Sequence, residues 1–220
     1  FFELLRRYSL QTDLVVASVS LGRNRAELER LVGPFINLLP IRSRPRSDLA
    51  VESFVKKVQQ SVLGALEHQS YPFDALVDEL NLPKNLSRSP LADVNFSYMS
   101  FEGPQRSFTD AAIPGLSDLE VQQYPGPLPR ASKVDLMLFC RKLTHLETET
   151  EKEKKTETET LQLDFEYCSA LFERTTIERM AGLYVTLLSE MATHPQATLG
   201  SLDILDPPNR RDLFAALGDP

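Results

Sequence analysis

The side chains that could act as acids, bases or nucleophiles are scattered in this 220-residue chain. The three histidines, His68, His145 and His194, are far apart in the sequence, and none has a partner at a catalytic spacing. The patterns GxSxG, GxGxxG, GxxxxGK(S/T) and HExxH, which place nucleophiles, phosphate-binding loops and zinc ligands, do not occur. The residues alone therefore predict no self-sufficient catalytic centre.

Each histidine has a structural interpretation. His68 follows a predicted long helix, where its ring could bond the last free carbonyl groups, and a ligand-facing role is the alternative. His194 stands at a predicted helix end before Pro195, which indicates a capping or surface role. His145 is expected in one strand of a hairpin.

A run of arginines offers a second kind of chemistry. Arg42, Arg44 and Arg46 follow a predicted strand in the sequence RSRPR, and Pro45 should hold this segment extended. Guanidinium groups bind phosphate oxygens through two parallel hydrogen bonds, so a phosphate contact is one interpretation. A solvated loop is the other, and we favour it.

Composition argues against several classes of protein. With 42% hydrophobic residues and a net charge of −7, the chain has the profile of a soluble globular protein and lacks the basic surplus of a general nucleic-acid binder. No apolar run approaches the ~20 residues of a membrane span. Cys140 and Cys168 form no CxxC pair, so we expect reduced thiols in a cytoplasmic protein and no structural metal. The start, FFELL, has neither an initiator Met nor a signal pattern, so we expect the chain to begin inside a longer polypeptide.

Hydrophobic periodicity predicts an α+β fold, with a mixed β-sheet and helices packed on one face. Thr175 and Glu178 have the spacing of a capping box at the start of the last helix. The predicted helices cover residues 48–67, 73–80 and 175–194, and the predicted strands cover residues 13–21, 35–42, 93–101, 133–143 and 161–167.

Three segments break this periodicity. Residues 104–114 and 125–129 contain closely spaced Pro and Gly and are predicted to be surface connections. Residues 147–160, ETETEKEKKTETET, consist only of Glu, Thr and Lys. Because their flanks can pair around a lysine-rich turn, we predict a protruding hairpin over about residues 143–162 in preference to disorder. An acidic docking surface is the functional alternative.

Three stretches follow one another along the chain: VGPFINLLPIR at residues 32–42, HQSYPFD at 68–74 and KNLSRSPL at 84–91. They resemble the fifth, sixth and seventh core motifs of the condensation domains of nonribosomal peptide synthetases, (I/V)GxFVNTxxxR, HQDYPFE and RDxSRNPL. The chain departs from these motifs at Leu38, where the family has Thr, at Ser70, where it has an acid, and at Asp74, where it has Glu.

The resemblance extends over nearly the whole chain. The strand that leads to Gly22 and Arg23, the stretch Lys133–Leu136, and Phe165–Tyr167 with the helix after it are similar to elements of the family. On this basis we expect residues 1–200 to be the C-terminal lobe of a condensation domain, with a chloramphenicol acetyltransferase-like fold. Residues 201–220 resemble the linker towards an adenylation domain.

This resemblance implies one half of an enzyme. Family members have two lobes with a tunnel between them, and the N-terminal lobe contributes an HHxxxDG motif; this chain contains neither HH nor DG. The implied reaction forms amide bonds between aminoacyl or peptidyl thioesters carried on phosphopantetheine arms, with no cofactor bound directly. The implied partners are the N-terminal lobe, the upstream and downstream peptidyl carrier proteins and the adjacent adenylation domain. Alternatives are an epimerising, cyclising or degenerate carrier-recruiting domain of the same fold, and a non-catalytic interaction module.

The resemblance also nominates site residues. Asn37 is expected to point towards the tunnel, where its amide could bind a pantetheine or substrate amide; an Asn bonded to backbone groups is the alternative. Gly33 is expected to allow a tight turn or a close backbone approach. Arg88 is expected to anchor a loop, with substrate contact as the alternative. No catalytic residue or metal ligand is expected in this chain. The tunnel set is Gly33, Phe35, Asn37 and Leu38, and the set with motif or structural roles is Arg42, His68, Gln69, Tyr71, Pro72, Phe73, Ser87, Arg88 and Pro90.

Overall fold

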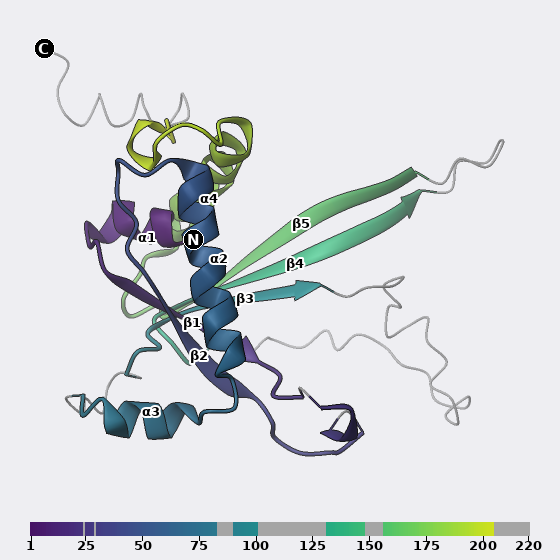
Figure 1. The fold of residues 1–220 in the computed structure, drawn as a ribbon. Helices are drawn as coiled ribbons and strands as arrows, with labels where there is room; N and C mark the ends of the chain where they lie inside the picture. Colours follow the sequence, from purple (N-terminus) through teal and green to yellow (C-terminus); the bar gives the residue numbers. More distant parts are fainter. Residues whose placement is uncertain (24, 29, 83–89, 101–130, 148–155, 205–220) are drawn as a thin grey trace, which may run out of the picture.

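The fold is a five-stranded mixed sheet with helices on one face (Figure 1). The computed structural model describes residues 1–204 except 24, 29, 83–89, 101–130 and 148–155. In chain order the described elements are α1 (Phe2–Ser9), β1 (Leu14–Ser20), the short 3-10 helix η1 (Ala26–Leu28), β2 (Asn37–Ser43), α2 (Val51–Glu67), α3 (Phe73–Glu79), β3 (Val94–Ser100), β4 (Leu136–Glu147), β5 (Thr156–Tyr167), α4 (Arg174–Thr193) and the short 3-10 helix η2 (Leu199–Ser201).

The sheet has the strand order β2-β1-β3-β4-β5. The two outer pairs, β1 with β2 and β4 with β5, are antiparallel, whereas β3 runs parallel to both of its neighbours. The register sets Ser20 opposite Asn37 at one end of the β1–β2 pair, which puts both residues on the same face of the sheet. Each predicted strand is present, and the mixed sheet confirms the predicted α+β class.

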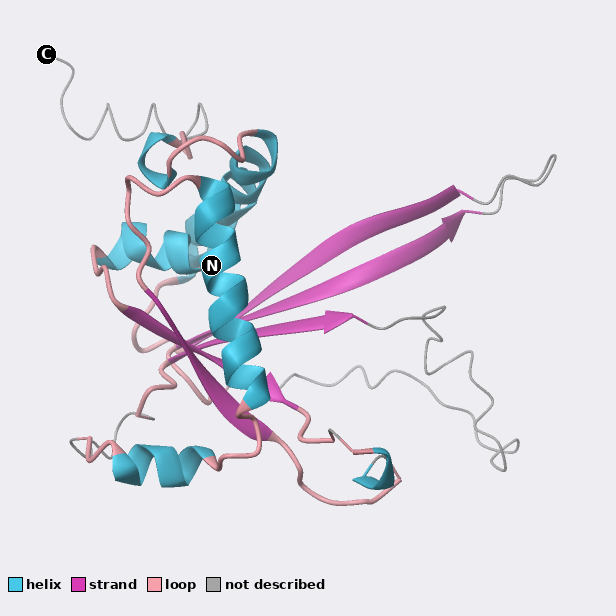
Figure 2. Cartoon of the chain, in the orientation of Figure 1, coloured by secondary structure: helices cyan, strands magenta, loops and turns pink. Residues whose placement is uncertain are grey.

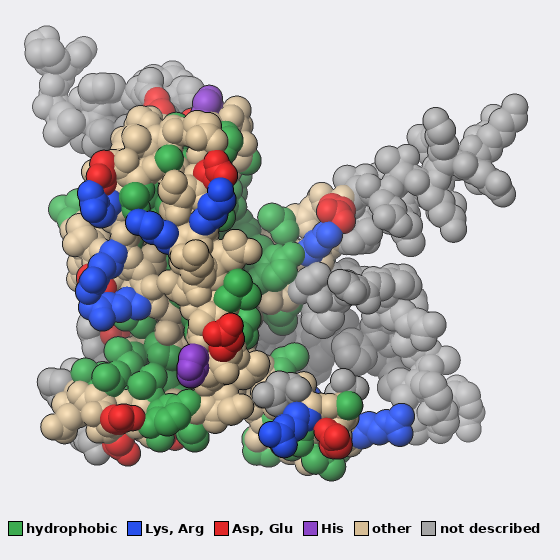
Figure 3. All heavy atoms as spheres, viewed as in Figure 1, with side chains coloured by type: hydrophobic (Ala, Val, Ile, Leu, Met, Phe, Trp, Pro, Cys, Tyr) green, Lys and Arg blue, Asp and Glu red, His purple; other side chains and the backbone are tan. Residues whose placement is uncertain are grey.

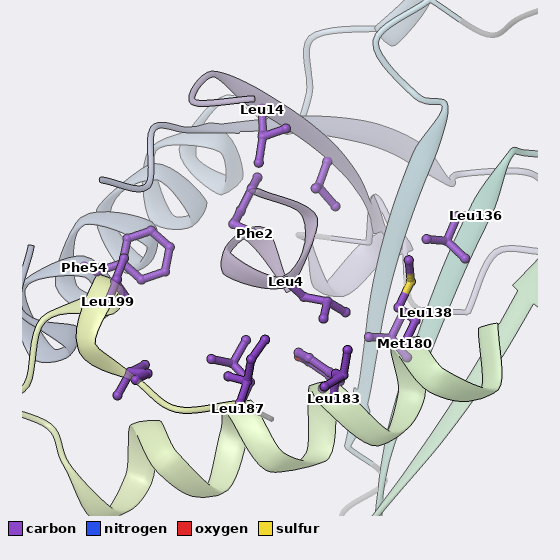
Figure 4. Packing of buried hydrophobic residues seen from close by; sticks show 14 of the residues in the cluster. Phe2, Leu4, Leu14, Phe54, Leu136, Leu138, Met180, Leu183, Leu187 and Leu199 are labelled. Carbon is purple, nitrogen blue, oxygen red and sulfur yellow. The ribbon is translucent and has the colours of Figure 1, made fainter. Parts of the chain in front are cut away.

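The core lies between the sheet and the helices (Figure 4). Alternate residues of the strands point towards it, as the period of two in a half-buried strand requires. Leu138 of β4 and Leu4 of α1 are completely buried, and Leu187 of α4 is 1% exposed. Since residues of α1, α2 and α4 share one cluster with these strand residues, the helices cover a single face of the sheet.

The helices α2 and α4 both begin without a capping hydrogen bond from a side chain. The capping box at Thr175 and Glu178 is wrong: α4 begins at Arg174, Glu173 is the N-cap, and no side chain caps it. Thr175 therefore lies inside the first turn, and Glu178 pairs instead with Arg174 at 2.7 Å. The first turn of α2 is capped by backbone carbonyl groups, because the N–H of Val51 donates to the oxygen of Ala197 at 2.9 Å.

The hairpin of β4 and β5 extends beyond the rest of the sheet (Figure 2). The pairing of β3 with β4 ends at Ser100 and Lys142, but β4 and β5 continue to pair as far as Glu147 and Thr156. The flanks of the Glu/Thr/Lys segment are thus paired strands. The turn between them, and the predicted surface connections at 104–114 and 125–129, lie outside the described residues.

Candidate functional site

The segments that resemble the fifth and sixth motifs meet at one cavity of about 440 Å³. One wall comes from the loop between β1 and β2, and the other comes from the turn that joins α2 to α3. The lining residues are Gly22, Arg25, Leu28, Pro34, Phe35, Ile36, Asn37, Gln69, Ser70 and Pro72.

Asn37 joins the two walls. Its Nδ2 donates to the carbonyl oxygens of Gln69 at 3.0 Å and Tyr71 at 2.7 Å, and its Oδ1 accepts from the N–H of Phe73 at 3.1 Å. Both amide hydrogens and the amide oxygen are therefore bonded to backbone groups, which is the second of the two alternatives for this residue. The side chain of Asn37 fixes the α2–α3 turn on the end of β2.

A second bond supports the same junction. Ser20 lies opposite Asn37 in the sheet, and its hydroxyl donates to Oε1 of Gln69 at 2.6 Å. The hydroxyl oxygen also accepts from the N–H of Gly22 at 3.2 Å. Ser20 is 5% exposed, so these bonds satisfy a buried hydroxyl group. Sequence reasoning did not select Ser20, because its only local signal is a polar residue at the end of an apolar strand.

Gly22 and Phe35 make the close backbone approach that was expected at Gly33. Gly22 has φ +64°, and a Cβ added there would lie 1.9 Å from the carbonyl oxygen of Phe35. A Cβ at Gly33 would lie 3.4 Å from the Phe35 ring, which is an ordinary contact, and Gly33 does not have a positive φ. The requirement for glycine therefore falls on Gly22.

Arg23, the residue after Gly22, contacts three other residues of the loop between β1 and β2. Its guanidinium carbon lies 4.5 Å from the centroid of the Phe35 ring, in a cation–π contact. The same guanidinium donates to the carbonyl oxygen of Leu28 and, at 2.7 Å, to that of Leu31. Gly22 and Arg23 were noted in the sequence only as part of the family resemblance, so their contacts are a finding of the structure.

Leu38 points away from this cavity. It follows Asn37 in β2, so its side chain lies on the face of the sheet opposite the one that α1, α2 and α4 cover. There it lines a second cavity of about 900 Å³ together with Val19, Met137 and Phe139. The predicted tunnel residues therefore belong to two surfaces, with Phe35 and Asn37 at the first cavity and Leu38 at the second.

The remaining residues of the sixth motif build the turn and the helix after it. Nδ1 of His68 is 2.8 Å from the carbonyl oxygen of Gly64, which confirms the predicted bond to a free carbonyl at the end of α2. The hydroxyl of Tyr71 donates to Glu79 at 2.6 Å, and this bond to a carboxylate raises the pKa of Tyr71. Pro72 is the N-cap of α3, and Phe73 is its first residue. In the seventh motif Pro90 is partly buried, and Ser87 and Arg88 lie outside the described residues.

The arginines at the end of β2 and directly after it are paired with carboxylates. Arg42 donates to both oxygens of Asp13, at 2.7 and 2.6 Å, and Arg44 donates to Asp13 at 3.0 Å. These bonds hold the pKa of Asp13 well below its usual value. Arg46 is paired with Asp48 at 2.5 Å. Basic and acidic side chains lie beside one another on the face shown in Figure 3. For Arg44 and Arg46 the pairing agrees with the favoured interpretation, a solvated loop, whereas Arg42 lies in the strand β2.

Other candidate chemistry is limited in the part of the chain that the structure describes. His194 is half-exposed and lies 3.3 Å from Glu190 on the last turn of α4, as a surface residue at a helix end would. Cys140 is buried, Cys168 is partly buried, and both are free thiols. Within the described ranges, no three potential metal ligands are grouped, and no helix combines the length and hydrophobicity that crossing a membrane requires.

Comparison with known proteins identifies the family. The profile of the condensation domain matches residues 1–214, and the chain belongs to this family. It is 36% identical over 210 residues to a plipastatin synthase of Bacillus subtilis and 35% identical over 202 residues to bacitracin synthase 3 of Bacillus licheniformis. These matches cover 96% and 92% of the chain but only 5% and 3% of the two relatives.

Solved structures show the same fold. The X-domain from teicoplanin biosynthesis is 27% identical with a TM-score of 0.73, and the match covers 92% of this chain and 42% of that one. A four-domain nonribosomal peptide synthetase bound to AMP and glycine is 24% identical with a TM-score of 0.72, and the match covers 94% of this chain and 15% of that one. The predicted resemblance to condensation domains is therefore confirmed.

Proposed function

We propose that this chain is the C-terminal lobe of a condensation domain that forms amide bonds in nonribosomal peptide synthesis. Membership of the family supports the reaction class. The observation that carries the proposal for this lobe is the bonding of Asn37 to Gln69, Tyr71 and Phe73, because it assembles two family motifs into the walls of one cavity.

The reaction joins two carrier-bound substrates. The amine of the acceptor attacks the carbonyl carbon of the donor thioester, a C–N bond forms, the C–S bond breaks, and the donor arm leaves as a thiol while the amine loses a proton. We assign the proton chemistry to the HHxxxDG motif of an N-terminal lobe. The C-terminal lobe contributes positioning, which can lower the barrier by several kcal/mol when two long arms are held head to head.

The proposal extends to carriers and neighbours. The substrates would arrive on phosphopantetheine arms of upstream and downstream peptidyl carrier proteins, and no cofactor would bind this lobe directly. Residues 1–200 would form the lobe, and residues 201–220 would lead towards an adenylation domain in a cytoplasmic synthetase. We propose that Phe35 faces the substrates at the 440 Å³ cavity, with Gly33 and Asn37 shaping the wall beside it, and that Leu38 faces them at the 900 Å³ cavity on the other side of the sheet.

The test is reconstitution. A complete condensation domain that carries this chain as its C-terminal lobe should convert a donor carrier and an acceptor carrier to the amide, measured by mass spectrometry of the carriers. Replacing the second His of HHxxxDG by Ala should abolish the product. The 220-residue chain alone should give no product above uncatalysed aminolysis, because half a tunnel cannot align two arms. A complete domain with an intact motif that binds both carriers but forms no amide would contradict the proposal and favour a carrier-recruiting relative.

A further inference from the structure

The loop between β1 and β2 forms one wall of the cavity. This loop, residues 21–36, contributes Arg25, Leu28, Phe35 and Ile36 to the lining of the 440 Å³ cavity. Among its described residues, the backbone hydrogen bonds join Leu28 to Arg25 and Leu31 to Leu28, so both are internal to the loop. Neither bond connects the outer part of the loop to its root beside the sheet.

Arg23 makes that connection. It lies at the root, directly after Gly22 with its positive φ, and its guanidinium reaches the carbonyl oxygens of Leu28 and Leu31 in the outer part. Its guanidinium carbon also lies over the ring of Phe35, where the chain returns to β2, at 4.5 Å from the ring centroid. One planar group therefore contacts the outgoing and the returning arms of the loop. A guanidinium is suited to this because it presents several donors in its plane and stacks on aromatic rings.

The loop also carries apolar side chains that the lobe leaves exposed. Val32 is fully exposed, Leu21 is 70% exposed, and Ile36 is 67% exposed. Of these three residues, Ile36 lines the cavity. Its position depends on the same contacts, because Ile36 follows the Phe35 that Arg23 contacts.

We propose that Arg23 is a positioning residue for the substrate cavity of this lobe. By stacking on Phe35 and bonding Leu28 and Leu31, it sets the wall against which a carrier-bound acyl substrate lies. This inference rests on the proposed function, because it assigns the cavity to the condensation substrates. Arg23 acts through the loop and is not a catalytic residue.

The test compares Arg23→Lys with Arg30→Ala in the complete condensation domain. Lysine keeps the charge but loses the planar fork and the stacking surface. Arg30 is an exposed arginine of the same loop that does not line the cavity, so its replacement is a matched control. Arg23→Gln, which keeps an amide donor for the carbonyl oxygens and loses the charge over the Phe35 ring, is the second variant if Arg23→Lys folds poorly.

Two measurements decide the outcome. Steady-state kinetics with each carrier varied in turn should show KM for the donor or acceptor carrier raised on the order of tenfold in Arg23→Lys, with kcat within about twofold of wild type, because a misplaced wall weakens binding in the ground and transition states alike. Hydrogen exchange of the segment 25–36 should be faster in Arg23→Lys than in Arg30→Ala. A merely structural role would lower the amount of folded enzyme and leave KM unchanged, and that result would overturn the inference.

The exchange measurement separates this inference from the proposed function. It needs no substrate, so a wild-type domain that forms no amide would contradict the proposed function while the holding of the loop by Arg23 is still tested. An active wild-type domain whose Arg23→Lys and Arg30→Ala variants have equal KM values and equal exchange rates would overturn the positioning role alone.

Discussion

Nδ2 of Asn37 lies 2.7 Å from the carbonyl oxygen of Tyr71, although the two residues are 34 positions apart in the chain. The bond connects the first residue of β2 to the turn before α3, and the same amide also reaches Gln69 and Phe73. An amide is the smallest side-chain group that can donate twice and accept at once. Asn37 is therefore a structural junction between two motifs that lie on different elements.

Replacement of Asn37 by Ala should destabilise the chain. The change leaves two carbonyl oxygens and one N–H without their partner, and we expect the free energy of unfolding to fall by about 1–3 kcal/mol. Asn37→Asp keeps the acceptor for Phe73 but cannot donate to Gln69 or Tyr71, so it should also destabilise the chain. Denaturant unfolding of the three proteins provides the measurement. Unchanged stability with slower condensation per folded molecule would show instead that the amide serves the substrate.

Two glycine replacements should have opposite effects. Gly22→Ala should lower stability, because φ +64° costs an L-residue about 1 kcal/mol and the new Cβ would lie 1.9 Å from the oxygen of Phe35. Gly182→Ala is the matched control, since Gly182 lies inside α4 and a Cβ there meets nothing within 4 Å. That change should stabilise the chain by about 0.5–1 kcal/mol. Thermal unfolding compares them, and a stable Gly22→Ala variant would contradict the close approach.

Sequence periodicity was sufficient to locate the strands and the helices α2, α3 and α4, because each has apolar residues at a regular spacing. It missed α1, whose sequence FELLRRYS contains a glutamate and two arginines. Glu3 of α1 is nevertheless 1% exposed, because Arg6 and Arg7 each bond it at 2.7 Å. Arg7 also donates to the carbonyl oxygen of Leu199 at 2.6 Å. The ion pairs of Glu3 are local, but the contact of α1 with the C-terminal part of the chain, shown by the bond from Arg7 to Leu199, cannot be inferred from local pattern.

The contacts of the candidate site could likewise be predicted from the sequence only in part. The motifs predicted which segments belong together, and the bond of His68 to a free helix carbonyl followed from its place at the end of α2. The partners of Asn37 could not be predicted, because they depend on how the α2–α3 turn lies on the sheet. The requirement for glycine at Gly22 was assigned to Gly33 for a similar reason: it arises from contact with Phe35, which only the folded loop provides.

Alkaline pH should weaken the fold through Tyr184. Burial raises the pKa of this phenol to about 12, from a usual value of 10.0, and the ring packs edge-on against Phe1 and Phe165. A raised folded-state pKa gives stability that is complete below pH 10 and is lost as the pH rises from 10 through about 12, because only the unfolded chain ionises there. Wild type should therefore lose about 1 kcal/mol relative to Tyr184→Phe by pH ~11. Denaturant unfolding at about pH 9 and about pH 11 measures this, and an equal loss in both proteins would contradict it.

Shortening the β4–β5 hairpin should leave the fold and condensation intact. The pairing with β3 ends at Ser100 and Lys142, so the outer part of the hairpin pairs only with itself among the described strands. Leu143 lies directly opposite Thr160, and an Asn–Gly link between them preserves the register and suits a two-residue turn. Among the described residues the cut removes the ion pair between Lys142 and Glu159, and exposed pairs contribute about 0–1 kcal/mol.

The control for this deletion is a deeper cut with the same turn. Phe139 and Asp164 also lie opposite each other, but joining them removes Cys140, which is 7% exposed, and leaves the outer part of β3 without its partner. We expect the first variant to unfold within about 1 kcal/mol of wild type and the second to be clearly destabilised, because the second removes the buried Cys140 and the partly buried Leu163. Circular dichroism and denaturant unfolding measure stability, and the carrier assay in the complete domain measures activity. If the shorter cut abolished condensation in a folded domain, the hairpin would be a docking surface, and loss of binding to a carrier protein or an adenylation domain would identify its partner.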